Sequence, residues 1–173
     1  MEAELLHGPP ISGKYEEHNF AESGDTIWVK FFDEEWLEWC GVFSPGWCSG
    51  SSVHKVPGKA EFLVLAGGQG YFVDPNKRKI ISKTETDNIV AVIYITESEV
   101  FVVSDGLCVG ILYGDKIEWR TNRISVDGIK FTRSQGVTVE GILNDLTEEG
   151  GPFKLNVVTG EIEAPWLFYH NVG

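Results

Sequence analysis

The sequence lacks any long apolar run. No stretch approaches the ~18 consecutive apolar residues that a membrane-spanning helix needs, so we expect no membrane segment. The first residues, MEAELLH, contain neither the basic segment nor the apolar core of a secretory signal. Cysteine is also scarce, and three residues, an odd number, favour a reducing compartment over a disulfide framework. We therefore predict a cytoplasmic protein.

Positively charged residues are also few. The chain has 14 Lys and Arg residues against 26 Asp and Glu residues, which gives a net charge of −12. Binding to nucleic acid through its phosphates requires a basic surface, so we expect no nucleic-acid partner. A strongly acidic surface keeps a protein soluble and attracts basic proteins. The charge balance is explained first by solubility alone, and it also fits a basic protein partner or a mimic of nucleic-acid charge.

Helical periodicity is absent as well, because no window of about eleven residues repeats its apolar side chains at helical spacing. The chain instead contains 20 glycines, which tolerate the positive φ angles of tight β-turns. At 173 residues it is long enough for one domain with a core and short for two. We predict a single all-β domain over 1–173, with an arm, a Trp-rich hairpin and a loop in 1–59 and repeats in 60–173.

The repeats show most clearly in residues 61–121, where one pattern of three short strands occurs twice. Corresponding positions, such as Phe62 and Phe101 or Ile80 and Ile117, are separated by roughly forty residues, the length of one propeller blade. The predicted strands are 61–67, 70–74 and 79–84, then 99–105, 108–113 and 116–121, and in a divergent third copy 124–131, 136–142, 152–158 and 161–163. The nearly continuous apolar run 88–96 predicts a central strand buried on both faces.

Other segments are assigned from turn residues and aromatic content. Residues 1–14 hold Gly and Pro with little periodicity, which predicts an arm or an entry loop. Residues 26–32 and 36–43 predict a hairpin rich in tryptophan. Residues 47–59 hold Gly, Ser and Pro with few apolar side chains, and we expect an irregular loop there.

The middle copy carries a family resemblance. Its first strand ends at Asp105-Gly106, a turn follows at Gly114, and in the third strand Ile117 is followed by Trp119. This pattern resembles the blades of β-propellers of the PQQ-type quinoproteins and of WD-like repeats, over about residues 60–165. The resemblance implies antiparallel blades in a half-propeller or a small β-propeller, since three units are too few for a large ring. A β-sandwich built from the same hairpins is the alternative. Quinoproteins use a full ring and a metal site, so no quinone cofactor is expected.

Three motifs suggest chemistry without establishing it. Cys40, Cys48 and His54 are zinc-ligand types, but their spacing does not match the usual pairs of ligands, which are two to four residues apart. Cys48 also lies at the centre of a Gly-x-Cys-x-Gly sequence like a nucleophile elbow, yet the α/β context of that motif is missing. The glycine run 67–70 is followed by a strand rather than a helix and predicts a turn. We predict no catalytic residue, no metal and no cofactor.

Clustered carboxylates and tryptophans offer a candidate binding surface. Four carboxylates cluster at the hairpin and three more occur on a second loop, where they could form an acidic docking face. The alternatives are a solvated turn for the carboxylates and a core position for each tryptophan. The candidate partner-binding residues are Asp33, Glu34, Glu35, Trp36, Glu38, Trp47, His54, Asp145, Glu148 and Glu149.

These features lead to three hypotheses of different classes. The first is a non-enzymatic acidic module that binds another protein, for example an immunity or inhibitor protein that covers the basic site of a toxin or nuclease. The second is a small hydrolase or carbohydrate-active enzyme that uses the loop 47–59 with His54 as a base. The third is a structural homodimer in which two copies complete a propeller.

Overall fold

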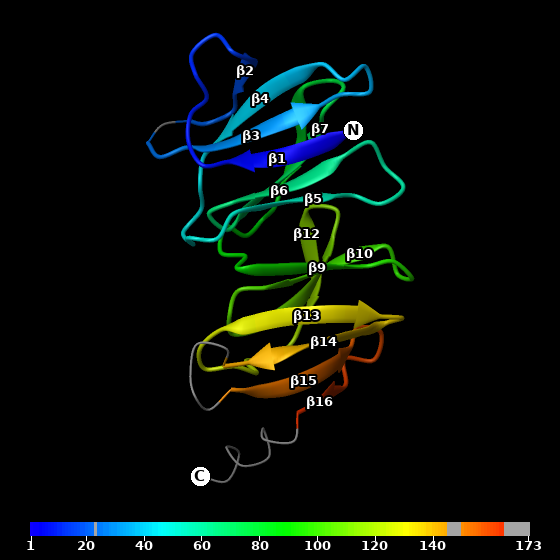
Figure 1. The fold of residues 1–173 in the computed structure, drawn as a ribbon. Helices are drawn as coiled ribbons and strands as arrows, with labels where there is room; N and C mark the ends of the chain where they lie inside the picture. Colours follow the sequence, from blue (N-terminus) through cyan, green and yellow to red (C-terminus); the bar gives the residue numbers. More distant parts are fainter. Residues whose placement is uncertain (23, 145–149, 165–173) are drawn as a thin grey trace. The chain divides into compact units, whose positions relative to one another are not determined.

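The computed structural model describes residues 1–22, 24–144 and 150–164, and within them the chain is all-β (Figure 1). Sixteen strands form four four-stranded sheets, and no helix occurs in the described residues. The all-β class predicted from the sequence is thus confirmed, and the small sheets are compatible with blade-like repeats or with a sandwich. The chain divides into two compact units, Met1–Ile89 and Val90–Gly173, each with two sheets.

The first sheet has the strand order β1-β3-β4-β2, in which β2 runs parallel to β4 and the other pairs are antiparallel. Its strands are β1 (Glu2–Leu6), β2 (Glu16–Asn19), β3 (Ile27–Phe32) and β4 (Glu38–Phe43). The predicted hairpin is present as β3–β4. The prediction of a loop over 1–14 is wrong for β1, which pairs with β3 and alternates exposed glutamates with the core-facing Ala3 and Leu5.

The second sheet follows chain order as an antiparallel meander. Its strands are β5 (Ser52–Lys55), β6 (Phe62–Ala66), β7 (Gln69–Asp74) and β8 (Lys79–Lys83). Gly67 and Gly68 have φ angles of 51° and 92° and close a two-residue turn between β6 and β7, so the predicted turn is confirmed. β5 lies inside the segment 47–59, which was wrongly predicted to be irregular. Its only apolar residue is Val53, and pairing with β6 rather than its own pattern makes it a strand.

The core of the first unit is aromatic and lies between its two sheets. Phe31, Trp39 and Phe43 from the first sheet pack against Phe62 and Tyr71 from the second. The rings of Phe31 and Trp39 stack with their centroids 4.5 Å apart. Trp39 is fully buried and its Nε1–H donates to the carbonyl of Pro75 at 3.0 Å. Removing a buried side chain of this size from a core costs about 3–5 kcal/mol, so this tryptophan has a structural role.

The third and fourth sheets are both meanders in chain order and make up the second unit. The strands of the third sheet are β9 (Ala91–Ile95), β10 (Val100–Ser104), β11 (Val109–Tyr113) and β12 (Lys116–Arg120). Those of the fourth are β13 (Ile129–Gln135), β14 (Thr138–Leu143), β15 (Gly151–Asn156) and β16 (Ile162–Glu163). Buried aliphatic residues of both sheets, among them Val102, Val139 and Leu155, form one core with Phe153.

The position of β9 differs from the prediction of a central strand buried on both faces. β9 lies at the edge of its sheet, and apart from Ile95 its residues are only partly buried. It contacts β13 of the fourth sheet, where the Ser134 hydroxyl donates to the carbonyl of Tyr94 at 3.0 Å. Its apolar run therefore reflects packing between two sheets rather than a central position in one.

Among the described residues there is also no helix with the length and apolarity that a membrane crossing requires.

The loop between β4 and β5 packs closely on the β6–β7 turn. The N–H of Gly46 donates to the carbonyl of Ala66 at 2.9 Å, and the N–H of Trp47 donates to that of Asp87 at 3.0 Å. A Cβ atom at Gly46 would lie 2.2 Å from the Asp87 carbonyl oxygen and 2.8 Å from that of Gly67. Both are backbone atoms of ordered segments, so this position requires glycine.

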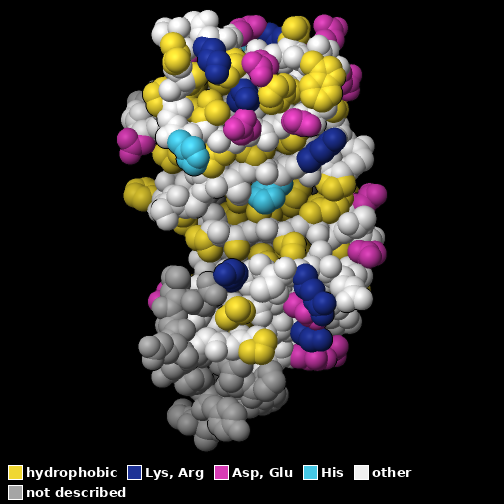
Figure 2. Space-filling model, viewed as in Figure 1, with side chains coloured by type: hydrophobic (Ala, Val, Ile, Leu, Met, Phe, Trp, Pro, Cys, Tyr) yellow, Lys and Arg dark blue, Asp and Glu magenta, His cyan; other side chains and the backbone are white. Residues whose placement is uncertain are grey.

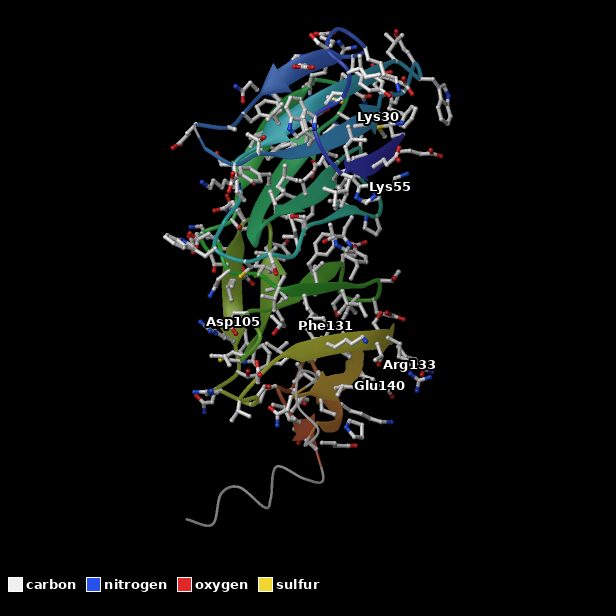
Figure 3. All side chains as sticks on the ribbon, turned by 60° about the vertical axis from the view of Figure 1, so that its left-hand side comes forward. Lys30, Lys55, Asp105, Phe131, Arg133 and Glu140 are labelled. Atoms are coloured by element: carbon white, nitrogen blue, oxygen red, sulfur yellow. The ribbon has the colours of Figure 1, made fainter. Side chains whose placement is uncertain are left out.

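The exposed face of the fourth sheet is held by ion pairs around Glu140 (Figure 3). Its carboxylate accepts from Arg133 Nε at 2.6 Å and lies 3.1 Å from Lys154 Nζ. The hydrogen bonds from Arg133 and then Lys154 lower the pKa of Glu140 from 4.5 to about 2. The carboxylate is therefore charged in the folded protein well into the acidic range.

We predict that Gly46→Ala destabilises the protein by about 1–3 kcal/mol, the usual cost of forcing atoms into a packed site. Urea unfolding of the purified variant measures this change. Gly8→Ala is the matched control, because a Cβ at Gly8 meets no atom within 4 Å. Equal unfolding midpoints for the two variants would contradict the close approach at Gly46.

We further predict that Glu140 contributes to stability at neutral pH and that this contribution disappears in acid. Because its folded pKa lies below the unfolded value, the contribution is complete above pH 4.5 and is lost as the pH falls towards about 2. The difference in unfolding free energy between wild type and Glu140→Gln should shrink over that range. Glu118→Gln, on an exposed position of β12, serves as the control. A difference that stays constant down to pH 2 would refute the assignment.

Candidate functional site

The turn between β3 and β4, residues 33–37, is closed by its own first side chain, and we call it the acidic turn. Asp33 Oδ1 accepts the N–H groups of Glu35 at 3.0 Å and Leu37 at 2.9 Å. The backbone adds bonds from Asp33 N–H to the Leu37 carbonyl and from Trp36 N–H to the Asp33 carbonyl, both at 3.2 Å. Aspartate commonly bonds backbone groups two or more residues ahead in this way. The acidic turn is thus fixed from within.

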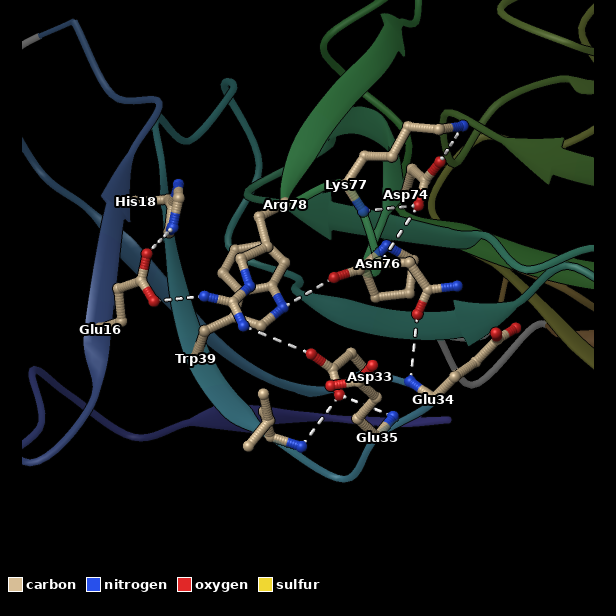
Figure 4. Close-up of polar contacts among 12 residues, drawn as sticks. Glu16, His18, Asp33, Glu34, Glu35, Trp39, Asp74, Asn76, Lys77 and Arg78 are labelled. Carbon is tan, nitrogen blue, oxygen red and sulfur yellow. Dashed lines mark hydrogen bonds and ion pairs between the residues drawn. The ribbon is translucent and has the colours of Figure 1, made fainter.

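Arg78 ties the acidic turn to two other segments (Figure 4). Its Nη2 lies 3.3 Å from Asp33 Oδ2, and its Nη1 donates to Glu16 on β2. Glu16 in turn contacts His18 Nε2 at 2.9 Å. A guanidinium can bind two carboxylates at once because its donors form a rigid fork. One side chain from the β7–β8 turn therefore joins three separate segments of the chain.

The β7–β8 turn is organised in the same way as the acidic turn that it faces. Asp74 Oδ1 accepts the N–H groups of Asn76 at 3.1 Å and Lys77 at 3.0 Å, and Asp74 Oδ2 pairs with Lys77 Nζ at 2.9 Å. The Asn76 side-chain oxygen then accepts the N–H of Glu34 at 3.0 Å (Figure 4). Two self-braced turns are thus joined by a direct hydrogen bond.

The environment of Asp33 keeps it ionised. Its burial by itself raises the pKa, but the Leu37 N–H, the Arg78 guanidinium and the Glu35 N–H outweigh this effect and lower the pKa below the ordinary value. Each of these donors favours the charged carboxylate over the neutral acid. Asp33 therefore carries a fixed negative charge at neutral pH although it is only 7% exposed.

Trp36 projects from the acidic turn in an unusual conformation. Its φ angle is +61°, and its side chain is 63% exposed beside the half-exposed Leu37. A bulky residue at positive φ is an outlier, and such strain persists only where the surrounding bonds impose it. Here those hydrogen bonds are made by Asp33, which precedes Trp36 in the chain, and by Leu37, which follows it. The folded protein thus holds Trp36 in a strained backbone conformation with its aromatic side chain exposed to solvent.

A pocket of about 340 Å³ opens beside the acidic turn. Its lining combines carboxylates, an amide, a guanidinium and one apolar side chain. The lining residues are Asp33, Glu34, Glu35, Leu37, Asn76 and Arg78. Figure 2 shows acidic, basic and apolar side chains intermixed on the visible surface of the first unit. The arrangement offers a cationic, partly apolar group both charge and contact area.

The structure brings only part of the predicted binding surface together. Asp33, Glu34, Glu35 and Trp36 share the acidic turn, and Glu38 begins the strand that follows. The other predicted residues lie elsewhere. Trp47, 87% exposed, follows the far end of β4, roughly 20 Å away at about 3.3 Å per strand residue. His54 is on β5 of the second sheet, and Asp145, Glu148 and Glu149 lie outside the described residues.

The residues that sequence reasoning missed are those that brace the site. Asp74 ends the predicted strand 70–74, Asn76 lies between two predicted strands, and Glu16 and Arg78 carried no local signal. Their roles come from contacts between residues up to 62 positions apart. Within the described residues, no group of three or more His, Cys, Asp or Glu side chains is arranged so that it could hold a metal ion. Burial also raises the pKa of the Cys40 thiol to about 11, which makes it a poor ligand or nucleophile.

We predict that Asp33→Ala loosens the acidic turn without unfolding the sheets, because it removes the acceptor of two N–H groups and the partner of Arg78. Hydrogen exchange should become faster at the amides of Glu35 and Leu37, while the amides of β6 and β7 keep their protection. Glu34→Ala is the control, since its contact with Asn76 uses the backbone N–H. Unchanged exchange at both turn amides would show that Asp33 does not hold the turn.

No protein-family model matches the chain, and no curated protein matches it either. The likeness to propeller blades therefore stays a resemblance in strand pattern and sheet size. The geometry of the acidic turn is the basis on which a function can be assigned.

Proposed function

We propose that the acidic turn is a non-enzymatic docking surface for a basic protein, with Trp36 as the anchor. The observation that carries the proposal is the exposed Trp36 side chain, held at positive φ by a braced turn. Strained, over-determined residues cluster at ligand-binding sites. The consecutive four-stranded meanders support a blade-like scaffold, whose turns are free for recognition.

The energetics favour Trp36 as an anchor. A tryptophan contributes up to ~250 Å² of surface, so burial of its exposed part would remove roughly 150 Å² from water. At about 25 cal/mol per Å², this corresponds to about 4 kcal/mol, which is the scale of an interface hot spot. The bonds of Asp33 fix the turn before binding, so little ordering entropy is lost when a partner docks.

The surrounding charges support a basic partner. Glu34, Glu35 and Glu38 are exposed around Trp36, and the whole chain carries a net charge of −12. Arg78 does not reverse this local field, because Glu16 and Asp33 both neutralise it. Complementary charge raises association rates and rejects acidic competitors. A specific form of the proposal is an immunity or inhibitor protein that covers the basic site of a toxin or nuclease.

The test uses three immobilised baits in an extract of the source cells. They are wild type, Trp36→Ala, and the charge-reversed variant with Lys at positions 34, 35 and 38. We predict a protein that binds wild type only, and with the purified pair Trp36→Ala should weaken Kd at least ~30-fold, the effect of a hot spot of about 2 kcal/mol.

Trp47→Ala is the matched control, because this tryptophan is also exposed but lies at the other end of β4. Urea unfolding confirms that each bait is folded. The proposal fails if every captured protein binds Trp36→Ala as well as wild type, or if the purified pair is insensitive to both Trp36→Ala and charge reversal.

A further inference from the structure

β5 carries a serine and a histidine that face one another. Ser52 and His54 are two residues apart on a strand, so their side chains lie on the same face. The Ser52 Oγ and the His54 Nε2 are 2.8 Å apart. This is the distance at which a histidine can take the proton of a nucleophilic hydroxyl.

The environment of His54 favours the basic form of its ring. The side chain is half-buried, and this burial lowers the pKa of the imidazole below its ordinary value of 6.5. Burial acts in this direction because it disfavours the charged form. The ring is therefore neutral at pH 7, and with its proton on Nδ1 the Nε2 atom accepts from the Ser52 hydroxyl.

The ladder between β5 and β6 leaves the N–H group that follows Ser52 directed away from β6. Val56 N–H donates to the Glu61 carbonyl at 3.0 Å, which continues the pairing beyond β5. Bonded pairs alternate along an antiparallel ladder, so the bonds to β6 fall at Ser52 and His54. The N–H of Val53 then points away from β6, at the edge of the second sheet. The N–H that follows a nucleophile is a common oxyanion donor in hydrolases.

The backbone that carries this pair is held in place. The Ser51 hydroxyl accepts the N–H of Gly67 at 3.0 Å, and the N–H of Cys48 donates to the Gly67 carbonyl at 2.8 Å. β5 is thus anchored to the β6–β7 turn just before Ser52. A fixed backbone is what a reactive pair requires to keep its geometry.

We propose that Ser52 is a nucleophile for acyl transfer from small uncharged carboxylic esters, with His54 as the general base and the Val53 N–H as the oxyanion donor. Oγ bonds to the ester carbonyl carbon as its proton passes to His54 Nε2. The bond from this carbon to the alcohol oxygen then breaks, and Nε2 returns the proton to the departing alcohol. Water cleaves the acyl–serine by the same steps and restores Ser52. An uncharged ester fits because the acidic chain repels anions.

The experiment treats the folded protein with a fluorophosphonate probe and maps adducts by mass spectrometry. We expect one adduct, on Ser52, with Ser51 unlabelled as the internal control and no labelling in urea. His54→Gln should slow labelling by about 10²-fold, the scale of general-base catalysis. Ser52→Ala should abolish turnover of p-nitrophenyl acetate above the level of free imidazole.

The pH profile of the wild-type protein tests the base without any variant. The labelling rate should rise with pH and reach half of its plateau value below pH 6.5, because the pKa of His54 is lowered. The absence of an adduct on Ser52, equal labelling of Ser51, a flat pH profile, or wild-type rates in folded His54→Gln would each overturn the proposal. The site shares no residue with the acidic turn, so failure of one proposal leaves the other intact. Glu118→Gln, at an exposed position of β12, is the control and should label at the wild-type rate.

Discussion

The contact between the Asp33 carboxylate and its donors is the constraint on which the acidic turn depends. A nearly buried carboxylate loses its hydration, and only well-placed donors offset that loss. Here two N–H groups of the same turn and the Arg78 guanidinium provide them. Because Arg78 also binds Glu16, the charge of Asp33 orders β2, the acidic turn and the β7–β8 turn together. The strained conformation of Trp36 is a consequence of this bracing.

Tryptophan serves opposite purposes within a few residues of this chain. Trp39 is fully buried, stacks on Phe31 and donates its indole N–H to a backbone carbonyl. Trp36, three positions earlier, projects into solvent. The rigid aromatic core around Trp39 supports the hairpin, and the hairpin in turn supports the exposed side chain. As the proposed anchor, Trp36 would bind without large reorganisation, because its position is already set in the free protein.

The first unit therefore combines two surfaces with different chemistry. The acidic turn offers charge and a large aromatic group, which suit recognition of a basic protein. β5 offers a hydroxyl, a neutral imidazole and an N–H group, which suit acyl transfer. The two lie on different sheets and share no residue, so either activity can exist without the other. The fold by itself determines neither function, since small β-sheets of this kind support many functions.

The sequence by itself determined the all-β class, the β3–β4 hairpin, the Gly67–Gly68 turn and most strands of the repeats, because these follow from apolar patterns and turn residues within a few positions. It did not reveal β1 or β5, two short segments that become strands by pairing with β3 and β6. Only the tertiary structure decided that Arg78 meets Glu16 and Asp33, or that Asn76 bonds to the acidic turn. Strand and turn patterns depend on neighbouring residues, whereas these long-range contacts depend on how distant segments of the chain pack.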